Sequence, residues 1–310
     1  MVSGTDGLFG RIDEFPHDRA RDRFAALVGL DQIKELLIAE ARVLLDPSIV
    51  EHWSKKHHGK VIAAVADVIE RTSLVVLAGD VGTGKTELAE TVGDAIARAM
   101  NVPITLLPLS LTARGHGAVG EMTTLITRAF EKARETAAGG RSRDGKIRHG
   151  VILLIDEADA IAQSRELAQM HHEDRAGVNA LIRGIDGLRA ERLPVLTIMC
   201  TNRVDALDPA VRRRAAAIHE FTRPNDEQRR HLFKRSFDGV QISASDMSLL
   251  VKLTGPRDDR PYGATYSDLR QRFVPSSVLE ALNTGPLTGT RLVELARQFQ
   301  PTRPFAASTP

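Results

Sequence analysis

The segment GDVGTGKT, Gly79 to Thr86, constrains this 310-residue chain more than any other stretch of its sequence. It fits the pattern G-x-x-x-x-G-K-[ST], and it lies between an apolar run at 73–79 and a stretch of helical spacing at about 85–100. A strand, a glycine-rich turn and a helix in this order place backbone N–H groups and the positive end of a helix around an anion. The segment therefore predicts an α/β fold with a phosphate site at the end of a strand.

Further apolar runs predict buried strands at 102–109, 151–156, 194–200 and 216–221. Stretches with apolar residues at helical spacing lie before and between these runs, at 30–45, 61–71, 85–100, 121–138 and 174–189. Alternation of strands and helices favours a mostly parallel sheet that is covered by helices on both faces. The fold class predicted is α/β, with a parallel sheet between helices.

The pattern changes after Pro224, where the strands stop. Residues 225–300 are predicted to be helical, with breaks at Gly255, Pro261 and Pro286. The first 21 residues are polar, charged and aperiodic, and we expect them to be loose. The sequence thus predicts an N-terminal arm over 1–24, a large domain over 25–222, and a small helical lid domain with a tail over 223–310.

Composition excludes several classes of protein. Hydrophobic residues make up 42% and charged residues 26% of the chain, as in soluble globular proteins. The longest apolar runs are too short to cross a bilayer, and the start has no secretion-signal pattern. A single cysteine, Cys200, excludes a disulfide framework and fits a reducing compartment, so we expect a cytoplasmic protein. The net charge of +2 neither demands nor excludes nucleic acid.

The residue types around the loop suit nucleotide chemistry. Lys85 would reach the β- and γ-phosphates of a bound nucleotide, and Thr86 would contribute to a Mg²⁺ site. The run VILLIDE places Asp156 and Glu157 after a buried strand, where open α/β sheets bind their ligands. Asp156 suits the Mg²⁺ shell, and Glu157 could orient or deprotonate an attacking water. A protein that only binds nucleotide does not need this second carboxylate, so Glu157 favours hydrolysis.

Two more features lie between the fourth and fifth apolar runs, 194–200 and 216–221. Asn202 comes directly after 194–200, and its amide could face the terminal phosphate or the attacking water. The segment DPAVRRRA at 208–215 contains three consecutive arginines, Arg212 to Arg214. A run of like charges is usually solvated, whereas a guanidinium beside a phosphoryl transition state can raise its rate by roughly 10³–10⁵.

Together these motifs resemble the AAA+ ATPases of the classical clade, over about residues 25–300. VGLDQI at 28–33 is similar to the family's segment over the adenine, and VNALIRGIDGL at 178–188 is similar to its Asn-x-Leu…Asp-Gly helix. TNRVDALDPAVRRRA at 201–215 resembles the stretch from its sensor asparagine to its arginine fingers.

The resemblance implies a set of site residues. Nucleotide contacts are expected from Leu30 and from the loop residues Gly79, Asp80, Val81, Gly82, Thr83, Gly84, Lys85, Thr86 and Glu87. The lid arginine is assigned to Arg270, in preference to Arg272. Arg213 and Arg214 match the finger positions, which in this family act on the neighbouring subunit, while Arg212 is expected to be structural. A head-to-tail contact of this kind closes into a ring, and we expect a hexamer.

Within the family, the chain is most similar to the pachytene-checkpoint type, which remodels HORMA-domain proteins. VNALI at 178–182 carries this likeness. Bacterial relatives of that type accompany anti-phage cyclic-nucleotide signalling (CBASS) operons and switch their HORMA activators off. We expect no separate recruiting domain, so the chain would act through its own pore or lid. The pore loop is assigned to His116, Gly117, Ala118 and Val119, where Ala118 replaces the aromatic residue of threading relatives.

Other functions stay open at this level. A nucleic-acid motor or loader could use the basic residues of the loop at 139–150, but a nucleic-acid partner is the less favoured expectation. A general AAA+ chaperone or disassembly factor would carry the same motifs. A nucleotide-switched scaffold that barely hydrolyses ATP is disfavoured by Glu157 and by the paired arginines.

Overall fold

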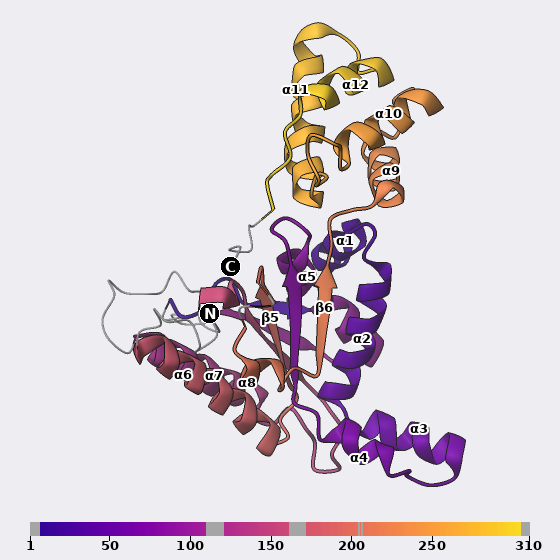
Figure 1. Cartoon of the computed structure of the whole chain (residues 1–310). Helices are drawn as coiled ribbons and strands as arrows, with labels where there is room; N and C mark the ends of the chain where they lie inside the picture. The colour runs from indigo at the N-terminus through magenta and orange to yellow at the C-terminus, as the bar shows by residue number, and fades with distance from the viewer. Residues whose placement is uncertain (1–6, 110–120, 161–171, 204, 206, 305–310) are drawn as a thin grey trace. The chain divides into compact units, whose positions relative to one another are not determined.

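The computed structural model describes residues 7–109, 121–160, 172–203, 205 and 207–304 (Figure 1). Two compact units divide the chain. The first, called the sheet unit here, comprises Met1–Ala26, Asp31–Ala78 and Thr86–Glu220. The second, the lid unit, comprises Leu27–Leu30, Gly79–Lys85 and Phe221–Pro310. The turn that contains the phosphate-binding motif therefore belongs to the same unit as the C-terminal helices.

A six-stranded sheet with the order β1-β3-β4-β5-β2-β6 forms the centre of the sheet unit. Its strands are β1 (Asp13–Phe15), β2 (Leu74–Gly79), β3 (Ile104–Leu109), β4 (Gly150–Ile155), β5 (Val195–Thr201) and β6 (Ala217–Phe221). The neighbours β3–β4, β4–β5 and β5–β2 are parallel, and β1 is antiparallel to β3. Every residue of β4 and β5 is buried, which explains why these strands are continuous apolar runs in the sequence.

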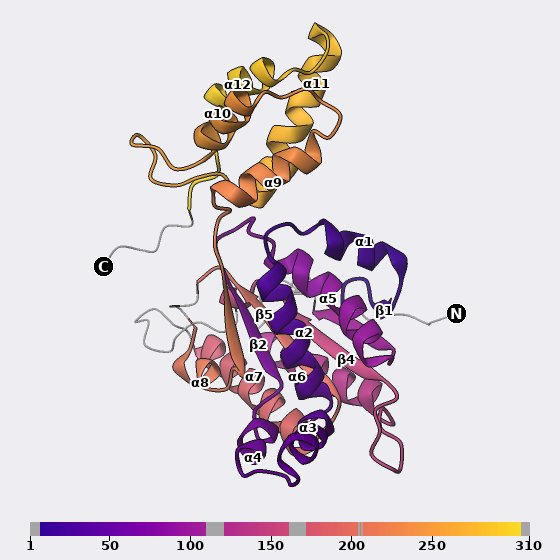
Figure 2. The same cartoon turned by 90° about the vertical axis from the view of Figure 1, so that its right-hand side faces the viewer.

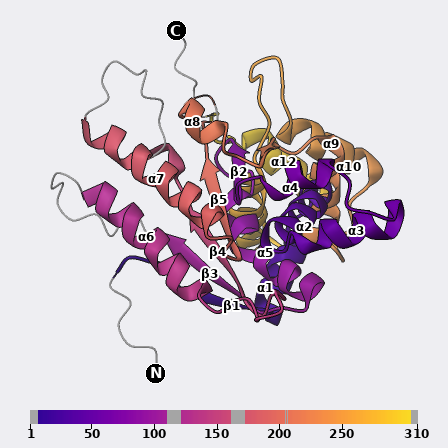
Figure 3. The same cartoon turned by 90° about the horizontal axis from the view of Figure 1, so that it is seen from below.

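Helices cover both faces of this sheet (Figure 2, Figure 3). The helices of this region are α1 (Asp18–Ala26), α2 (Asp31–Leu45), α3 (Ser48–His58), α4 (Ala64–Ile69), α5 (Lys85–Met100), α6 (Glu121–Ala137), α7 (His172–Ala190) and α8 (Pro209–Arg212). α6 and α7 lie on one face, and α2 and α5 lie on the other. Side chains of α6, α7 and the sheet form one hydrophobic core. Gly184 of α7 allows the close approach of α6, since a Cβ there would lie 2.3 Å from the Phe130 ring.

The N-terminal segment is more ordered than its composition predicts. Residues 13–15 form the edge strand β1, whose Phe15 pairs with Ile104 and is only 2% exposed. In α1, Arg23 forms a bidentate ion pair with Glu87 of α5, at 2.8 and 2.9 Å. The expectation that the first 21 residues are loose was therefore wrong for residues 13–21, which include β1 and the start of α1. A three-residue strand with one buried apolar side chain is too short to produce a detectable period.

The C-terminal part of the lid unit is helical, as predicted. It contains α9 (Asp226–Ser236), α10 (Ala244–Thr254), the π-helical turn η4 (Asp268–Phe273), α11 (Val274–Thr284) and α12 (Gly289–Gln298). These helices enclose a second hydrophobic core of their own. The predicted breaks at Gly255, Pro261 and Pro286 all fall between helices. None of the helices in the described residues is long and apolar enough to cross a membrane.

Candidate nucleotide-binding site

The glycines of the motif adopt conformations that other residues avoid. Gly79, Gly82 and Gly84 have φ angles of 145°, 75° and 102°. A Cβ on Gly79 would lie 2.1 Å from the carbonyl oxygen of Phe221, and one on Gly82 would lie 2.7 Å from Thr265 Oγ1. Both the backbone conformation and the lack of space therefore require glycine. The turn connects β2 directly to α5, as the motif predicts.

Lys85 is fixed inside this turn although its side chain carries a charge. The residue is 6% exposed, and its Nζ donates to the carbonyl oxygens of Gly79 and Asp80 at 2.8 and 2.9 Å. Thr83 Oγ1 donates to the same Asp80 oxygen at 2.7 Å. The loop thus carries a positioned ammonium group next to the N-terminus of α5, which is the chemistry of an anion site.

The flanking loop residues are placed differently. Val81 and Thr86 are exposed, so the Thr86 hydroxyl is accessible to a metal or a phosphate. The Glu87 carboxylate instead faces Arg23 of α1, and its hydrogen bond raises the pKa of Arg23 above the ordinary value. Any nucleotide contact of Glu87 would therefore have to come from its backbone.

Asp156 and Glu157 stand at the carboxyl end of β4. Glu157 is exposed and has a φ of +52°, a left-handed conformation that is rare for a residue with a side chain. Its N–H donates to Asp156 Oδ1 at 2.9 Å. Backbone strain of this kind concentrates at functional sites, where the surrounding structure maintains it. The predicted roles of the two carboxylates remain predictions, and their placement is compatible with them.

Asn202 is positioned by a residue that the motif analysis missed. Asp159, in the short 3₁₀ turn after β4, accepts the Asn202 N–H with both carboxylate oxygens, at 3.1 and 3.2 Å, and also accepts the Thr201 hydroxyl. The bond bridges residues 43 positions apart. The only sequence signal for it is a third acidic residue shortly after Asp156. Because β4, β5 and β2 are parallel neighbours, the residues that follow them leave the sheet at the same edge.

The metal site predicted from the sequence needs ligands beyond the protein. Among the residues that the structure describes, no group of three or more His, Cys, Asp or Glu side chains could hold a metal ion. Mg²⁺ typically takes one or two protein ligands and completes its shell with phosphate oxygens and water. Thr86 and Asp156 fit that kind of partial donor set, in which the nucleotide brings the remaining ligands.

The three arginines at the end of α8, Arg212 to Arg214, are in three different environments. The Asp208 side chain caps α8 by accepting the Ala210 N–H at 2.8 Å. Arg214 forms a bidentate ion pair with Asp186 of α7, at 2.8 and 2.9 Å, and this hydrogen bonding raises the pKa of Arg214. Arg213 is exposed, and its guanidinium has no hydrogen bond or ion pair within the described part of the chain.

Arg212 is also exposed and lies 3.8 Å from the carboxylate of Asp205, a weak surface pair. A cavity of about 280 Å³ lies beside the other two arginines. Its charged lining residues are Glu70, Arg71, Asp186, Arg189, Arg213 and Arg214. The two residues assigned as fingers are therefore not equivalent, since one is bound to its own chain and the other is accessible.

Within the lid unit, the phosphate-binding turn contacts Ser267 and Leu30. The Ser267 N–H donates to the Gly82 carbonyl at 3.0 Å. The Leu30 side chain also lies close to Gly84, because its Cδ1 is 3.4 Å from the position that an added Cβ on Gly84 would take. Arg270 is exposed on η4, so its assignment as the lid arginine stays a prediction. The assigned pore loop, His116 to Val119, lies outside the described residues.

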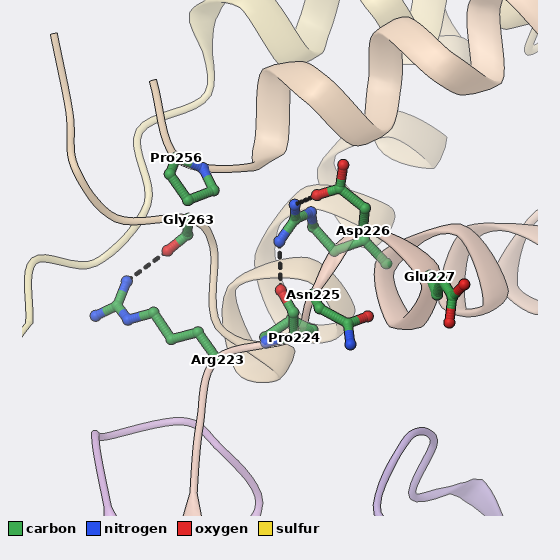
Figure 4. A pocket seen from close by; sticks show the side chains of 8 residues that line it. Arg223, Pro224, Asn225, Asp226, Glu227, Pro256 and Gly263 are labelled. Atoms are coloured by element: carbon green, nitrogen blue, oxygen red, sulfur yellow. Dashed lines mark hydrogen bonds and ion pairs between the residues drawn. The ribbon is translucent and has the colours of Figure 1, made fainter. Parts of the chain in front are cut away.

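The lid unit also contains a cavity of about 510 Å³ (Figure 4). It is lined by Arg223, Pro224, Asn225, Asp226, Glu227, Arg229, Pro256 and Gly263. The guanidinium of Arg223 points toward Gly263, and that of Arg229 bridges Pro224 and Asp226. This part of the lid is thus rich in arginines that are held by carbonyl oxygens and carboxylates.

A mostly parallel sheet, a glycine-rich turn with a fixed lysine and a carboxylate pair after β4 are the features of a P-loop ATPase. The chain belongs to the AAA ATPase family, since the model of the ATPase family associated with various cellular activities (AAA) matches residues 75–223 and near-full-length relatives support it. CD-NTase-associated protein 6 of Escherichia coli strain MS 115-1 is 51% identical over 300 residues, which are 97% of this chain and 96% of that protein. The same-named protein of strain KTE188 is 38% identical, over 95% and 96% of the two chains.

Two solved structures are similar over nearly the whole chain. A chain in the structure of the E. coli MS115-1 HORMA:CdnC:Trip13 complex has a TM-score of 0.91 and 49% identity, with 98% of this chain and all of that chain covered. The structure of Rhizobiales Trip13 has a TM-score of 0.76 and 46% identity, with 96% and 100% covered. The predicted AAA+ membership and fold class are confirmed.

We expect Asp159→Asn to loosen the segment around Asn202, whose N–H the Asp159 carboxylate accepts. The variant replaces the negatively charged acceptor of the Asn202 N–H by an amide, and hydrogen bonds to charged groups are worth about 1.5–3 kcal/mol. Hydrogen exchange should therefore rise by about tenfold in peptides that span 197–203. Asp205→Asn, at a 94% exposed carboxylate, is the control and should leave exchange in these peptides unchanged. Equal protection in both variants would contradict the positioning role of Asp159.

Proposed function

We propose that this chain binds ATP with Mg²⁺, hydrolyses it in a ring of identical subunits, and uses the energy to remodel a HORMA-domain protein. The observation that carries the proposal is the near-full-length likeness to a chain of the HORMA:CdnC:Trip13 complex. Because the Rhizobiales Trip13 structure also matches along its whole length, Trip13 is the component common to both comparisons. The proposed partner is therefore the HORMA-domain component of such a complex.

The residues of the site support binding and hydrolysis of ATP. When ATP binds, the Lys85 ammonium would donate to phosphate oxygens in place of the Gly79 and Asp80 carbonyl oxygens, while the backbone of the turn stays in place. Thr86 and Asp156 would hold the Mg²⁺, which neutralises phosphate charge when bound. Glu157 would orient the attacking water and accept its proton. Asn202, fixed by Asp159, would hold that water or the terminal phosphate in place.

The arginine environments refine the expected trans mechanism. Arg213 is exposed and is the guanidinium that a neighbouring subunit could reach directly. Arg214 is bound to Asp186 and would either release this carboxylate in the ring or orient the α8 turn. A head-to-tail contact that brings Arg213 to the neighbour's nucleotide closes into a ring, for which we propose six subunits.

Remodelling of a HORMA protein would disassemble its complex and, in bacteria, switch off cyclic-nucleotide anti-phage signalling. The name CD-NTase-associated protein 6 of the two E. coli relatives supports this setting. The alternative of a nucleic-acid motor would use the basic residues of the 139–150 loop. Arg141 is held by its own chain, because its Nη2 donates to the Leu45 carbonyl at 2.8 Å, while Arg143, Lys146 and Arg148 are exposed.

Two variants should separate binding from turnover. Lys85→Ala should abolish ATP binding, because it removes the ammonium from the loop. Glu157→Gln should bind ATP and not turn it over, because the amide cannot accept the proton of the water. Calorimetric binding of ATP and steady-state phosphate release measure the two properties. Equal loss of binding in both variants would refute the role of Glu157 in water activation.

A subunit-mixing experiment tests the arginines. The variant Arg213→Ala/Arg214→Ala should bind ATP and be inactive alone, and a mixture with inactive Lys85→Ala protein should recover part of the ATPase activity. Mixed interfaces then contain one intact nucleotide site and one intact pair of arginines. Even a hundredfold loss per site corresponds to about 2.7 kcal/mol, so the recovery is measurable. The single variants Arg213→Ala and Arg214→Ala assign the effect to one arginine, and we expect the larger loss from Arg213→Ala.

If the double variant keeps near-normal activity alone, the arginines are a solvated cluster. If the mixture stays inactive although subunit exchange is demonstrated by fluorescence transfer between labelled subunits, the arginines act within their own subunit.

A further inference from the structure

The second residue of the phosphate-binding turn is an aspartate with a fixed carboxylate. Asp80 Oδ2 accepts two hydrogen bonds from Arg223, from Nε at 2.8 Å and from Nη2 at 2.5 Å. Its other oxygen accepts the Val81 N–H at 2.8 Å. Both side chains of the ion pair are mostly buried, with 18% and 14% exposed. A carboxylate in a loop that binds phosphate repels its ligand unless a cation neutralises it.

Arg223 is held on its other side by two carbonyl oxygens. Nη1 donates to Gly263 at 2.5 Å, which Figure 4 shows, and to Thr302 at 2.9 Å. The guanidinium also lies over the ring of Tyr262, 5.2 Å from its centroid. Arg223 is therefore fixed in one orientation by the turn that precedes η4 and by the C-terminal segment.

The C-terminal segment is itself anchored in the lid. The Thr302 N–H and hydroxyl donate to the carboxylate of Asp268, at 3.0 and 2.6 Å. Burial acts to raise the pKa of Asp268, but hydrogen bonds from Thr302 and Thr265 outweigh it and lower this pKa. Asp268 also fixes the Thr265 loop, whose Thr265 hydroxyl lies next to Gly82. The tail and the phosphate-binding turn thus share one polar network.

The same network reaches Lys85. The backbone carbonyl of Asp80 accepts from Lys85 Nζ and from Thr83 Oγ1. Asp80 therefore contacts both cations: its carboxylate accepts from Arg223, and its backbone carbonyl accepts from Lys85. A displacement of the Asp80 peptide would move the ammonium that the proposed nucleotide site needs.

We propose that Arg223 is a positioning residue for nucleotide binding, which neutralises Asp80 and couples the phosphate-binding turn to the Gly263 turn and to the C-terminal segment at Thr302. This inference rests on the proposed function, and it makes a directional claim. Loss of Arg223 removes the cation that donates two hydrogen bonds to this carboxylate, whereas loss of the Asp80 charge removes a repulsion of the phosphates. Loss of Arg223 should therefore weaken nucleotide binding, whereas loss of the Asp80 charge should not.

The test is a double-mutant cycle on the full-length chain, measured by titration with a fluorescent N-methylanthraniloyl ATP. Arg223→Met should weaken binding by about tenfold, and Asp80→Asn should bind as tightly as the wild type or more tightly. The double variant should recover most of the loss. Raising the salt concentration should reduce the defect of Arg223→Met, because ions screen the repulsion. In turnover assays the change should lie in KM and not in kcat.

Matched controls are Arg291→Met and Glu280→Gln, which alter an ion pair elsewhere in the lid and should not change affinity. Melting temperatures identify any variant that does not fold, and Asp80→Asn carries the test if Arg223→Met fails to fold. A loss of affinity in Asp80→Asn as large as in Arg223→Met, or no rescue in the double variant, would overturn the inference. Failure of the wild type to bind the nucleotide would instead contradict the proposed function.

Discussion

The nucleotide site depends on the contact between the Lys85 ammonium and the carbonyl oxygens of Gly79 and Asp80. This contact exists because the turn bends through left-handed backbone conformations that only glycine adopts without strain. Two neighbours restrict this loop. The strand β2 leads directly into it, and the Phe221 carbonyl occupies the space that a Cβ on Gly79 would need. In the sheet unit, the parallel strands β4 and β5 end at one edge of the sheet, where the two carboxylates and the Asn202 amide follow them.

Much of the fold was predictable from the sequence, for physical reasons. The strands of a parallel sheet are buried on both faces, so β4 and β5 appear as unbroken apolar runs. The P-loop was predictable because its backbone geometry demands particular residues at fixed spacing. The edge strand β1 was not predictable, since Phe15 is its only buried side chain and its pairing partner lies 89 positions or more along the chain.

The contacts that orient the site were the least predictable. The pairs Asp159–Asn202, Asp186–Arg214 and Asp80–Arg223 join residues 43, 28 and 143 positions apart. No local pattern encodes such pairs, because only the folded topology brings their partners together. The sequence shows that Asp80 lies in a glycine-rich turn, but only the structure shows that its carboxylate is mostly buried and paired with a cation. Likewise, only the structure distinguishes Arg213, which is exposed, from Arg214, which is paired with Asp186.

Remodelling of a HORMA-domain protein by this chain should require the turnover of ATP. The most direct measurement uses the HORMA and CdnC proteins of E. coli MS115-1 as the probe complex, with a fluorophore on each, and follows the transfer of energy between them after addition of this chain. The transfer should fall when ATP is present, and it should persist with Glu157→Gln or without nucleotide. An intact HORMA:CdnC complex in the presence of the chain, while phosphate release shows that ATP is being hydrolysed, would contradict this expectation.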